Sequence, residues 1–235
     1  MWYIWKVGKR VKPKIIYEDN HLLVVEKPVN IPVQGDNTND LDMLNILKQD
    51  LKERYNKPGE VYLGLVHRLD RPVGGLMVFA KTSKAASRLS DQIRTRTFKK
   101  TYLAIVRGVP EKQKCTLRDY LLKDSSSNMV SVVREGTEDS KEAILDYQVI
   151  KSNGMLSLLQ IQLHTGRPHQ IRVQLSNAGY TLFGDQRYGA EVNKPGQQIA
   201  LWAYSVTFLH PTKKEEMTFT CETPKTEPWI LFANN

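Results

Sequence analysis

The order of apolar and polar positions along the chain predicts strands and helices in irregular alternation. The segment IIYEDNHLLVVEKP (15–28) has two short apolar runs around an Asp-Asn turn, which predicts a pair of strands. Two later stretches, one with Asp40 as its expected cap and one with Ser83, carry apolar residues at helical spacing and predict helices. These apolar positions are Leu44, Leu47 and Leu51, and then Ala85, Leu89 and Ile93.

The second half of the chain repeats this mixture of patterns. Residues 98–106 and 158–164 have strand character, and the turn TGRP (165–168) leads into a helix that Gly179 closes. That helix carries Ile171, Leu175 and Ala178 on one face. Several hairpin-like strand pairs and few strand-helix-strand units favour an α+β fold with a mostly antiparallel sheet. No repeat or long linker divides the chain, so residues 1–235 are expected to form one domain, with 1–14 as an N-terminal strand or arm.

The formal net charge of +9 makes a polyanionic partner the leading expectation, either nucleic acid or an anionic membrane surface. A membrane is the weaker alternative, because no segment shows a sustained amphipathic helix with a basic face. Cys115 and Cys221 lack the spacing of a disulfide framework or a zinc cluster, which favours a reducing cytoplasm. The opening residues MWYIWKVGKRVKPK reverse the order of a secretory signal.

Positive charge is concentrated in residues 88–118, which we call the basic segment. It contains nine lysines and arginines and two acids, and therefore seven of the nine net charges. Phe98 and Tyr102 lie among these cations, as expected of a surface where bases stack on rings and cations bind phosphates. A solvated helix face and ordinary sheet packing of Tyr102 are the alternatives.

The stretch HRLDRPVGG (67–75) places an acid between two arginines on a predicted loop between strands. Pro72 restricts the loop, and Gly74 and Gly75 permit positive φ. In the ordinary interpretation, Asp70 caps the turn by accepting a backbone hydrogen bond, and the two arginines are solvated surface charges. In the alternative, the arginines keep the Asp70 carboxylate ionised, which suits it to act as a nucleophile.

A third group of residues is HTGRPHQIR (164–172), where a turn delivers the start of a helix that attracts anions. Arg172 lies at the edge of the apolar stripe, so it needs an acidic partner, either Asp70 or another acid of the core. His164 and His169 lack a third metal ligand and are expected to form hydrogen bonds instead.

Six short motifs in order resemble those of RluA-type pseudouridine synthases, from about residue 15 to residue 224. They are HRLD (67–70), GGL (74–76), KTYLA (100–104), TGRPHQIRVQL (165–175), GDQRYG (184–189) and LHP (209–211). The resemblance implies a central mixed, largely antiparallel sheet with flanking helices and a cleft across it. It also implies isomerisation of uridine in ribosomal or transfer RNA, without cofactor or metal.

The resemblance assigns roles to individual residues. Asp70 would be the nucleophile or base on the ribose, Arg172 would keep Asp70 ionised, and Tyr102 would stack on the base and help remove the C5 proton. Arg68 would fill the space of the flipped base, and Leu201 would line the uracil pocket. We expect RNA to bind through residues of the basic segment and one further arginine, namely Arg94, Arg96, Lys99, Lys100 and Arg167.

The chain departs from the family pattern at Asn30, Val73-Gly74, Gln174 and Trp202, where the family usually has Gly, Thr-Ser or Thr-Gly, His and His. These departures leave the proposed catalytic groups in place. Val73-Gly74 and Gln174 are the only hints of the alternative function, a catalytically impaired RNA-binding or RNA-remodelling protein on the same fold. Many members carry a small RNA-binding domain before the catalytic one, and we expect none here, since few residues stand ahead of IIYEDN. We expect a monomer that selects its RNA through the catalytic domain.

Overall fold

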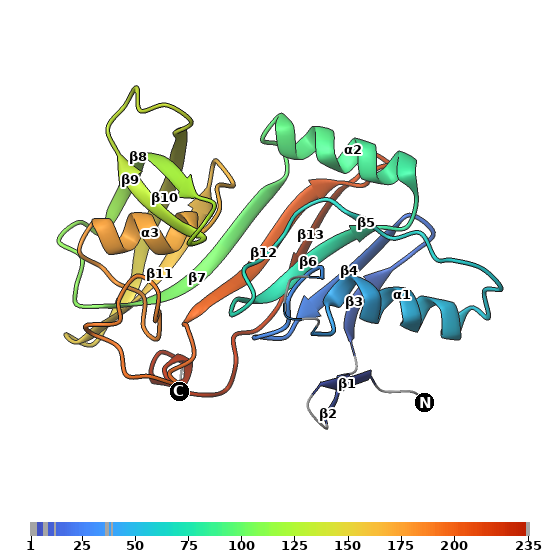
Figure 1. Ribbon diagram of the computed structural model, residues 1–235, viewed down its shortest axis with the longest axis horizontal. Coiled ribbons are helices and arrows are strands. Elements are labelled where there is room, and N and C mark those ends of the chain that lie inside the picture. Colours follow the sequence, from blue (N-terminus) through green and yellow to red (C-terminus); the bar gives the residue numbers. More distant parts are fainter. Residues whose placement is uncertain (1–3, 7–8, 12, 36–37, 39, 234–235) are drawn as a thin grey trace. The chain divides into compact units, whose positions relative to one another are not determined.

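The structure is a computed structural model that describes residues 4–6, 9–11, 13–35, 38 and 40–233 (Figure 1). The chain divides into two compact units. The first unit contains residues 1–98 and 205–221, and the second contains residues 99–204 and 222–235. Each unit combines strands with helices, so the expected α+β class is confirmed.

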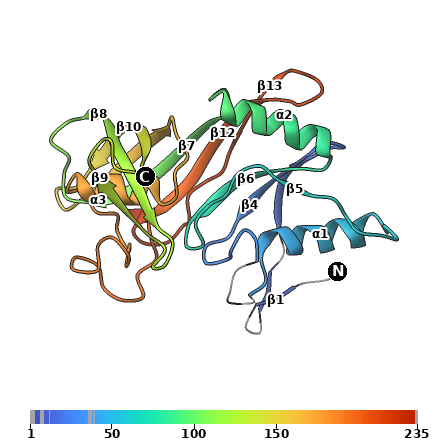
Figure 2. The same cartoon turned by 45° about the horizontal axis from the view of Figure 1, so that its top comes forward.

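The first unit holds two helices and most of the N-terminal strands. Its helices are α1 (Met43–Arg54) and α2 (Ser83–Arg94), which run alongside β4 and β6 in Figures 1 and 2. Its strands are β1 (Ile4–Lys6), β2 (Lys9–Val11), β3 (Lys14–Glu18), β4 (Leu22–Lys27), β5 (Gly64–Leu65), β6 (Gly74–Ala80) and β13 (Glu216–Thr220). Residues 205–209 of β12 (Leu201–Leu209) also belong to this unit and pair with β13.

Strands β3, β4 and β6 are neighbours in that order, each antiparallel to the next, and β5 pairs with the far end of β6. The predicted strand pair at 15–28 is therefore confirmed. Asp19 forms its turn by accepting the backbone N–H groups of His21 and Leu22. Every residue of β6 is buried, which explains why this segment is an apolar run without alternation.

Both helices of the first unit form where the apolar spacing predicts them, but each begins at a different cap. Asp42, not Asp40, accepts the N–H of Asn45 at the start of α1. Thr82, not Ser83, accepts the N–H of Ala85 at the start of α2. The caps were misplaced because several residues with side chains able to cap a helix stand next to one another in the sequence.

The second unit is built on a five-stranded antiparallel arrangement with the order β7-β11-β10-β8-β9. Its elements are β7 (Lys99–Arg107), β8 (Lys114–Asp124), β9 (Met129–Val133), β10 (Lys141–Ser152), β11 (Leu156–Leu163), α3 (Gln170–Asn177), the start of β12 and a 3-10 helix, η1 (Trp229–Leu231). The core of this unit lies on the fully buried residues of β7, β10 and β11, among them Ala104, Leu145 and Leu159.

Helix α3 packs against β8 and β9. Val173 on this helix joins a buried cluster with Leu121, Val130 and Ala143. Gly179 ends the helical region as predicted, with φ of 85° and its N–H donated to the carbonyl of Ser176. Ala178 is the C-cap, so it lies just beyond the helix.

Several sequence predictions stay predictions. The expected single domain of 1–235 and the expected cleft across the sheet are among them, because both depend on how the two units are placed relative to each other. The expected N-terminal arm falls partly outside the described residues, at 1–3, 7–8 and 12, while β1 and β2 pair antiparallel within it. Among the described residues, none of the helices is long and apolar enough to cross a membrane.

Candidate active site

Asp70 lies on the loop that joins β5 to β6, as the sequence predicts. Its carbonyl accepts the N–H of Val73 at 3.0 Å, which closes a tight turn directly after the acid. The preceding residue, Leu69, is buried, and Asp70 itself is partly exposed. Gly75 has φ of 112°, whereas Gly74 is not among the residues with positive φ, so only one of the two glycines fulfils the expected backbone role.

The side chains around Asp70 point in different directions along the loop. His67 accepts the N–H of Val78 through Nε2 at 3.0 Å and packs its ring on Phe98. Arg68 is exposed, and its expected contact with RNA stays a prediction. Arg71 forms an ion pair with Asp40 and donates to the Thr38 hydroxyl at 3.1 Å. The loop is therefore attached to the body of the first unit on both sides of Asp70.

The part of the basic segment in the first unit lies on α2 and the turn after it. Arg94 is 75% exposed and pairs with Asp91 at 2.5 Å, an exposed pair of small energetic value. Arg96 has φ of 61° in the turn. Phe98 is buried and stacks on Phe208 at 5.1 Å, so the expectation that its ring serves bases is corrected to a packing role.

An open pocket of about 720 Å³ adjoins α2. Gln92 fixes one wall, since its side chain donates to the carbonyl of Leu209 and accepts the N–H of the same residue. Arg88 fixes another by donating to the carbonyl of Pro211 at 2.5 Å. Three cations line this pocket against one acid, so its lining attracts anions: Arg88, Arg94, Lys214 and Asp91.

The rest of the basic segment belongs to the second unit. Lys99 is exposed, but burial lowers the pKa of the Lys100 ammonium. Gly166 leaves room for this ammonium, because a Cβ there would lie 3.3 Å from Lys100 Nζ. Arg167 donates through Nε to the carbonyl of Glu142 at 2.8 Å. Tyr102 is 6% exposed on β7, opposite Ile161 of β11.

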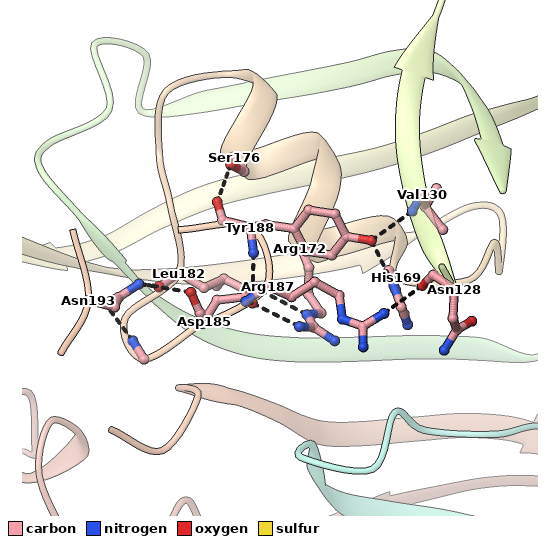
Figure 3. A network of polar contacts seen from close by, with 11 residues as sticks. Asn128, Val130, His169, Arg172, Ser176, Leu182, Asp185, Arg187, Tyr188 and Asn193 are labelled. Carbon is pink, nitrogen blue, oxygen red and sulfur yellow. Dashed lines mark hydrogen bonds and ion pairs between the residues drawn. The ribbon is translucent and has the colours of Figure 1, made fainter. Parts of the chain in front are cut away.

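Arg172 forms a two-point ion pair with Asp185, as Figure 3 shows. Its Nε and Nη2 each donate to one carboxylate oxygen at 2.8 Å. Arg172 is 6% exposed and Asp185 is 1% exposed, so both charges are removed from water. The sequence predicted a buried Arg172 with an acidic partner, and this pair fulfils that need within the second unit. The expected pairing of Arg172 with Asp70 stays a prediction.

Asp185 is held ionised despite its burial. Burial alone would raise the pKa of this carboxyl, but the hydrogen bonds and charge of Arg172 and the N–H groups of Arg187 and Tyr188 outweigh it and lower the pKa. Tyr188 also places its ring 5.2 Å from the Arg172 guanidinium. The motif GDQRYG thus provides both the carboxylate and the ring that orient Arg172.

Two of the departures from the family pattern are accommodated locally. Gln174 is fully buried, yet its amide donates to Asp119 at 2.7 Å and accepts from Gln170 at 3.0 Å. Asn30 has φ of 63°, a conformation that Asn adopts more readily than other residues with a Cβ. Neither substitution leaves a strained or unsatisfied position.

The histidines considered as metal ligands form hydrogen bonds instead, as expected. His164 Nε2 lies 2.6 Å from Asp146 Oδ2, and His169 Nδ1 lies 2.7 Å from the Tyr188 hydroxyl. In the part of the chain that the structure describes, no three His, Cys, Asp or Glu side chains gather closely enough to hold a metal ion.

The sequence patterns did not reveal three buried polar groups that hold other residues in place. Asp185 is the partner of Arg172. Lys27 is buried at the end of β4 and contacts the loop of Asp70. His210, buried in the LHP motif, bonds Asp19 at 2.8 Å. For Lys27, its place at the end of the apolar strand LLVVEK is the signal that could have revealed it.

Comparisons with known proteins agree with this arrangement of motifs. A family model described as RNA pseudouridylate synthase matches residues 21–177. An uncharacterized RNA pseudouridine synthase of Aquifex aeolicus is 33% identical, with 92% of this chain and 72% of that protein covered. The ribosomal large subunit pseudouridine synthase D of Zymomonas mobilis is 34% identical, with 90% and 69% covered.

Among solved structures, the human protein RNA Pseudouridylate Synthase Domain Containing 4 matches with a TM-score of 0.76. It is 25% identical, and the match covers 90% of this chain and 89% of that one. The motifs, the fold and these relatives lead to one conclusion: the chain belongs to the RluA-type RNA pseudouridine synthases and is an isomerase that acts on RNA.

Proposed function

We propose that this synthase converts specific uridines of ribosomal RNA to pseudouridine, with Asp70 as the nucleophile or base that acts on the ribose. The choice of RNA rests on the Zymomonas mobilis relative, which is a ribosomal large subunit pseudouridine synthase. Transfer RNA is the alternative substrate that the sequence left open. The large excess of cations on the chain suits either polyanion.

The proposed reaction exchanges one bond to the ribose for another. Asp70 either forms a bond to C1′ or removes the C2′ proton of the ribose, and the bond between C1′ and N1 of uracil breaks. The freed uracil rotates while enclosed, and its C5 forms a bond to C1′. When C5 attaches to C1′, the Asp70 bond breaks or the C2′ proton is returned. The C5 proton is then lost and N1 regains one, so the product is an isomer of the substrate. The anchored loop around Asp70 supports this role, because attack requires a carboxylate held in one position.

We assign Tyr102 to the uracil itself, stacking on its face and assisting removal of the C5 proton. Its low exposure on β7 suits a side chain that works away from water. Leu201 is assigned to the apolar wall of the uracil pocket, and it is buried at the start of β12. Arg172 is assigned to keep the carboxylate of Asp70 ionised, with its own orientation set by Asp185.

RNA binding is assigned to cations on both units. Arg68, proposed to fill the space of the flipped base, is exposed beside Asp70. Arg94, Arg96 and Lys99 are exposed and available to phosphates, and the pocket beside α2 adds Arg88 and Lys214 to them. Lys100 and Arg167 are more enclosed, so we assign them to the RNA near the target nucleotide.

We further propose that the protein works in the cytoplasm as a monomer and without a metal or cofactor. The family resemblance supports the last part, since carboxylate chemistry on the ribose needs no redox group. The reducing compartment is supported by the positions of Cys115 and Cys221, which lack the spacing of a disulfide framework or a zinc cluster.

Mapping of pseudouridines in total RNA from cells with and without the gene tests the choice of substrate. We expect one or a few ribosomal sites to lose pseudouridine, and the wild-type gene to restore them. Loss confined to transfer RNA would replace ribosomal RNA as the substrate. An unchanged map in both RNA classes would contradict the proposal.

A further inference from the structure

Asn193 is a buried amide in the loop that follows the motif GDQRYG (184–189). It belongs to the second unit and is 5% exposed. Burial of an amide is costly unless hydrogen bonds replace the water that it loses. An apolar side chain of similar size would fill the same space without that cost, so packing alone does not explain an asparagine at this position.

All four hydrogen-bonding positions of the Asn193 side chain are used. Its Nδ2 donates to the carbonyl of Leu182 at 3.0 Å and to the carbonyl of Asp185 at 3.2 Å, and Figure 3 shows the three residues together. Its Oδ1 accepts the backbone N–H of Gly184 at 2.9 Å and the Nε–H of Arg107 at 2.8 Å. A side-chain amide offers two donor and two acceptor positions, so this set of bonds is complete.

The turn that Asn193 holds carries the carboxylate that orients Arg172. Gly184, directly before Asp185, has φ of 76°, and a Cβ there would overlap a neighbouring backbone carbonyl. Beyond the turn, the backbone N–H of Arg187 donates to Asp185 Oδ1 at 2.9 Å. The direction of the carboxylate is therefore set by backbone that Asn193 fixes from one side and the chain after Asp185 fixes from the other.

We propose that Asn193 is a positioning residue for the reaction: it holds the turn that presents the Asp185 carboxylate to Arg172. This inference rests on the proposed function, in which the Arg172 guanidinium keeps Asp70 ionised. A two-point ion pair requires both pairs of atoms to be aligned, so a small rotation of Asp185 also turns the guanidinium. Asn193 stands outside the six motifs of the sequence, and the family resemblance assigns it no role.

Asn193→Leu keeps the approximate volume of the side chain and removes all four hydrogen bonds. We expect the single-turnover rate at saturating RNA to fall by about 10-fold or more, because misplaced groups at a reacting centre slow the chemical step. The dissociation constant for RNA should stay at the wild-type value, since phosphate contacts spread over many cations supply the affinity.

Two further measurements respond to the direction of Arg172 and not to stability alone. Exchange of the Arg172 Nε–H with solvent should be faster in Asn193→Leu, because this proton is held by Asp185 Oδ2. The acidic limb of the profile of single-turnover rate against pH should move to higher pH, because Asp70 loses the aligned guanidinium that keeps it ionised. Wild-type exchange or an unmoved limb in Asn193→Leu would overturn the inference.

Leu145→Ala is the matched control, because Leu145 is fully buried on β10 of the same unit and its truncation makes a cavity without removing a polar partner. Its rate per folded molecule, its pH profile and its Arg172 Nε–H exchange should equal those of the wild type. Equal changes in both variants would overturn the inference, since they would reflect general weakening of the core. If Asn193→Leu does not fold, Asn193→Ser is scored by the same criteria, because its shorter side chain cannot reach all four partners.

Asp70→Asn is measured alongside and separates the two claims. An inactive Asp70→Asn with a fully active Asn193→Leu would overturn the positioning role and leave the role of Asp70 standing. Turnover in Asp70→Asn would instead contradict the proposed function, whatever Asn193→Leu does.

Discussion

Arg172 and Asp185 share a buried, two-point ion pair, with both guanidinium-to-carboxylate distances at 2.8 Å. A guanidinium held at two points has one orientation, and the Tyr188 ring beside it restricts it further. The family motifs TGRPHQIRVQL and GDQRYG are therefore parts of one structural feature, joined across 13 positions of sequence.

The first prediction concerns this pair. Asp185→Asn leaves the buried Arg172 charge without its carboxylate, and we expect the free energy of unfolding to fall by about 3 to 5 kcal/mol. Arg172→Met should destabilise the protein for the reciprocal reason. Urea denaturation at neutral pH measures both changes.

Asp91→Asn is the control for that experiment, because Asp91 and Arg94 also form an aspartate–arginine ion pair, but an exposed one. Its expected cost is below about 1 kcal/mol. Equal costs for Asp91→Asn and Asp185→Asn would show that burial does not determine the strength of the Arg172 pair.

The second prediction concerns the basic segment. Combined replacement of Arg94, Arg96 and Lys99 with Gln should weaken binding to every RNA tested and lower the salt dependence by about one unit of slope per lost phosphate contact. The single-turnover rate at saturating RNA should barely change. Binding titrations at several salt concentrations measure the slope.

The control replaces three exposed lysines outside the basic segment with Gln, namely Lys52, Lys57 and Lys225. Its net charge equals that of the Arg94, Arg96 and Lys99 variant. This control should retain most of the affinity and the wild-type slope. If the two triple variants behave alike, general charge rather than the basic segment attracts RNA. A fall in the saturating rate would mean that the segment also acts on the target base.

The third prediction is a pH dependence of stability at Asp19. Burial would raise the pKa of this carboxyl, but N–H groups of His21 and Leu22 and the bond to His210 lower it to about 2. A folded-state pKa below the unfolded value stabilises the fold above about pH 4, and this contribution is lost as the pH falls toward 2. Asp19→Asn should therefore cost about 1 to 2 kcal/mol at pH 7.

The same variant should approach the stability of the wild type between pH 4 and pH 2, where the wild-type carboxylate takes up its proton. Urea denaturation of both proteins across this range measures the difference. A difference that stays constant with pH would show that hydrogen-bond geometry, not the charge of Asp19, stabilises this turn.

The sequence predicted the elements better than the contacts between them. Periodic apolar residues placed α1, α2, β7 and β11, because hydrophobic spacing depends only on which face is buried. The helix caps were misplaced by one or two residues, since Asp40 and Asp42, or Thr82 and Ser83, are equally able to cap in isolation.

The sequence allowed candidate site residues with a distinctive local pattern to be singled out, such as Asp70 on its loop. Their supporting partners were not, because Lys27 and Asp185 lie 43 residues before Asp70 and 13 residues after Arg172, and only folding brings partners together. Phe98 illustrates the reverse error: its position among cations favoured RNA contact, but the Phe208 ring covers it.

The most direct test of the account follows the C5 hydrogen of uridine. Wild-type protein given its RNA substrate labelled with tritium at C5 should release the label, and Asp70→Asn should release none while it binds the same RNA with wild-type affinity. Measurable release by Asp70→Asn, or no release by the wild-type protein from any site that it modifies, would contradict the assignment of this chemistry to Asp70.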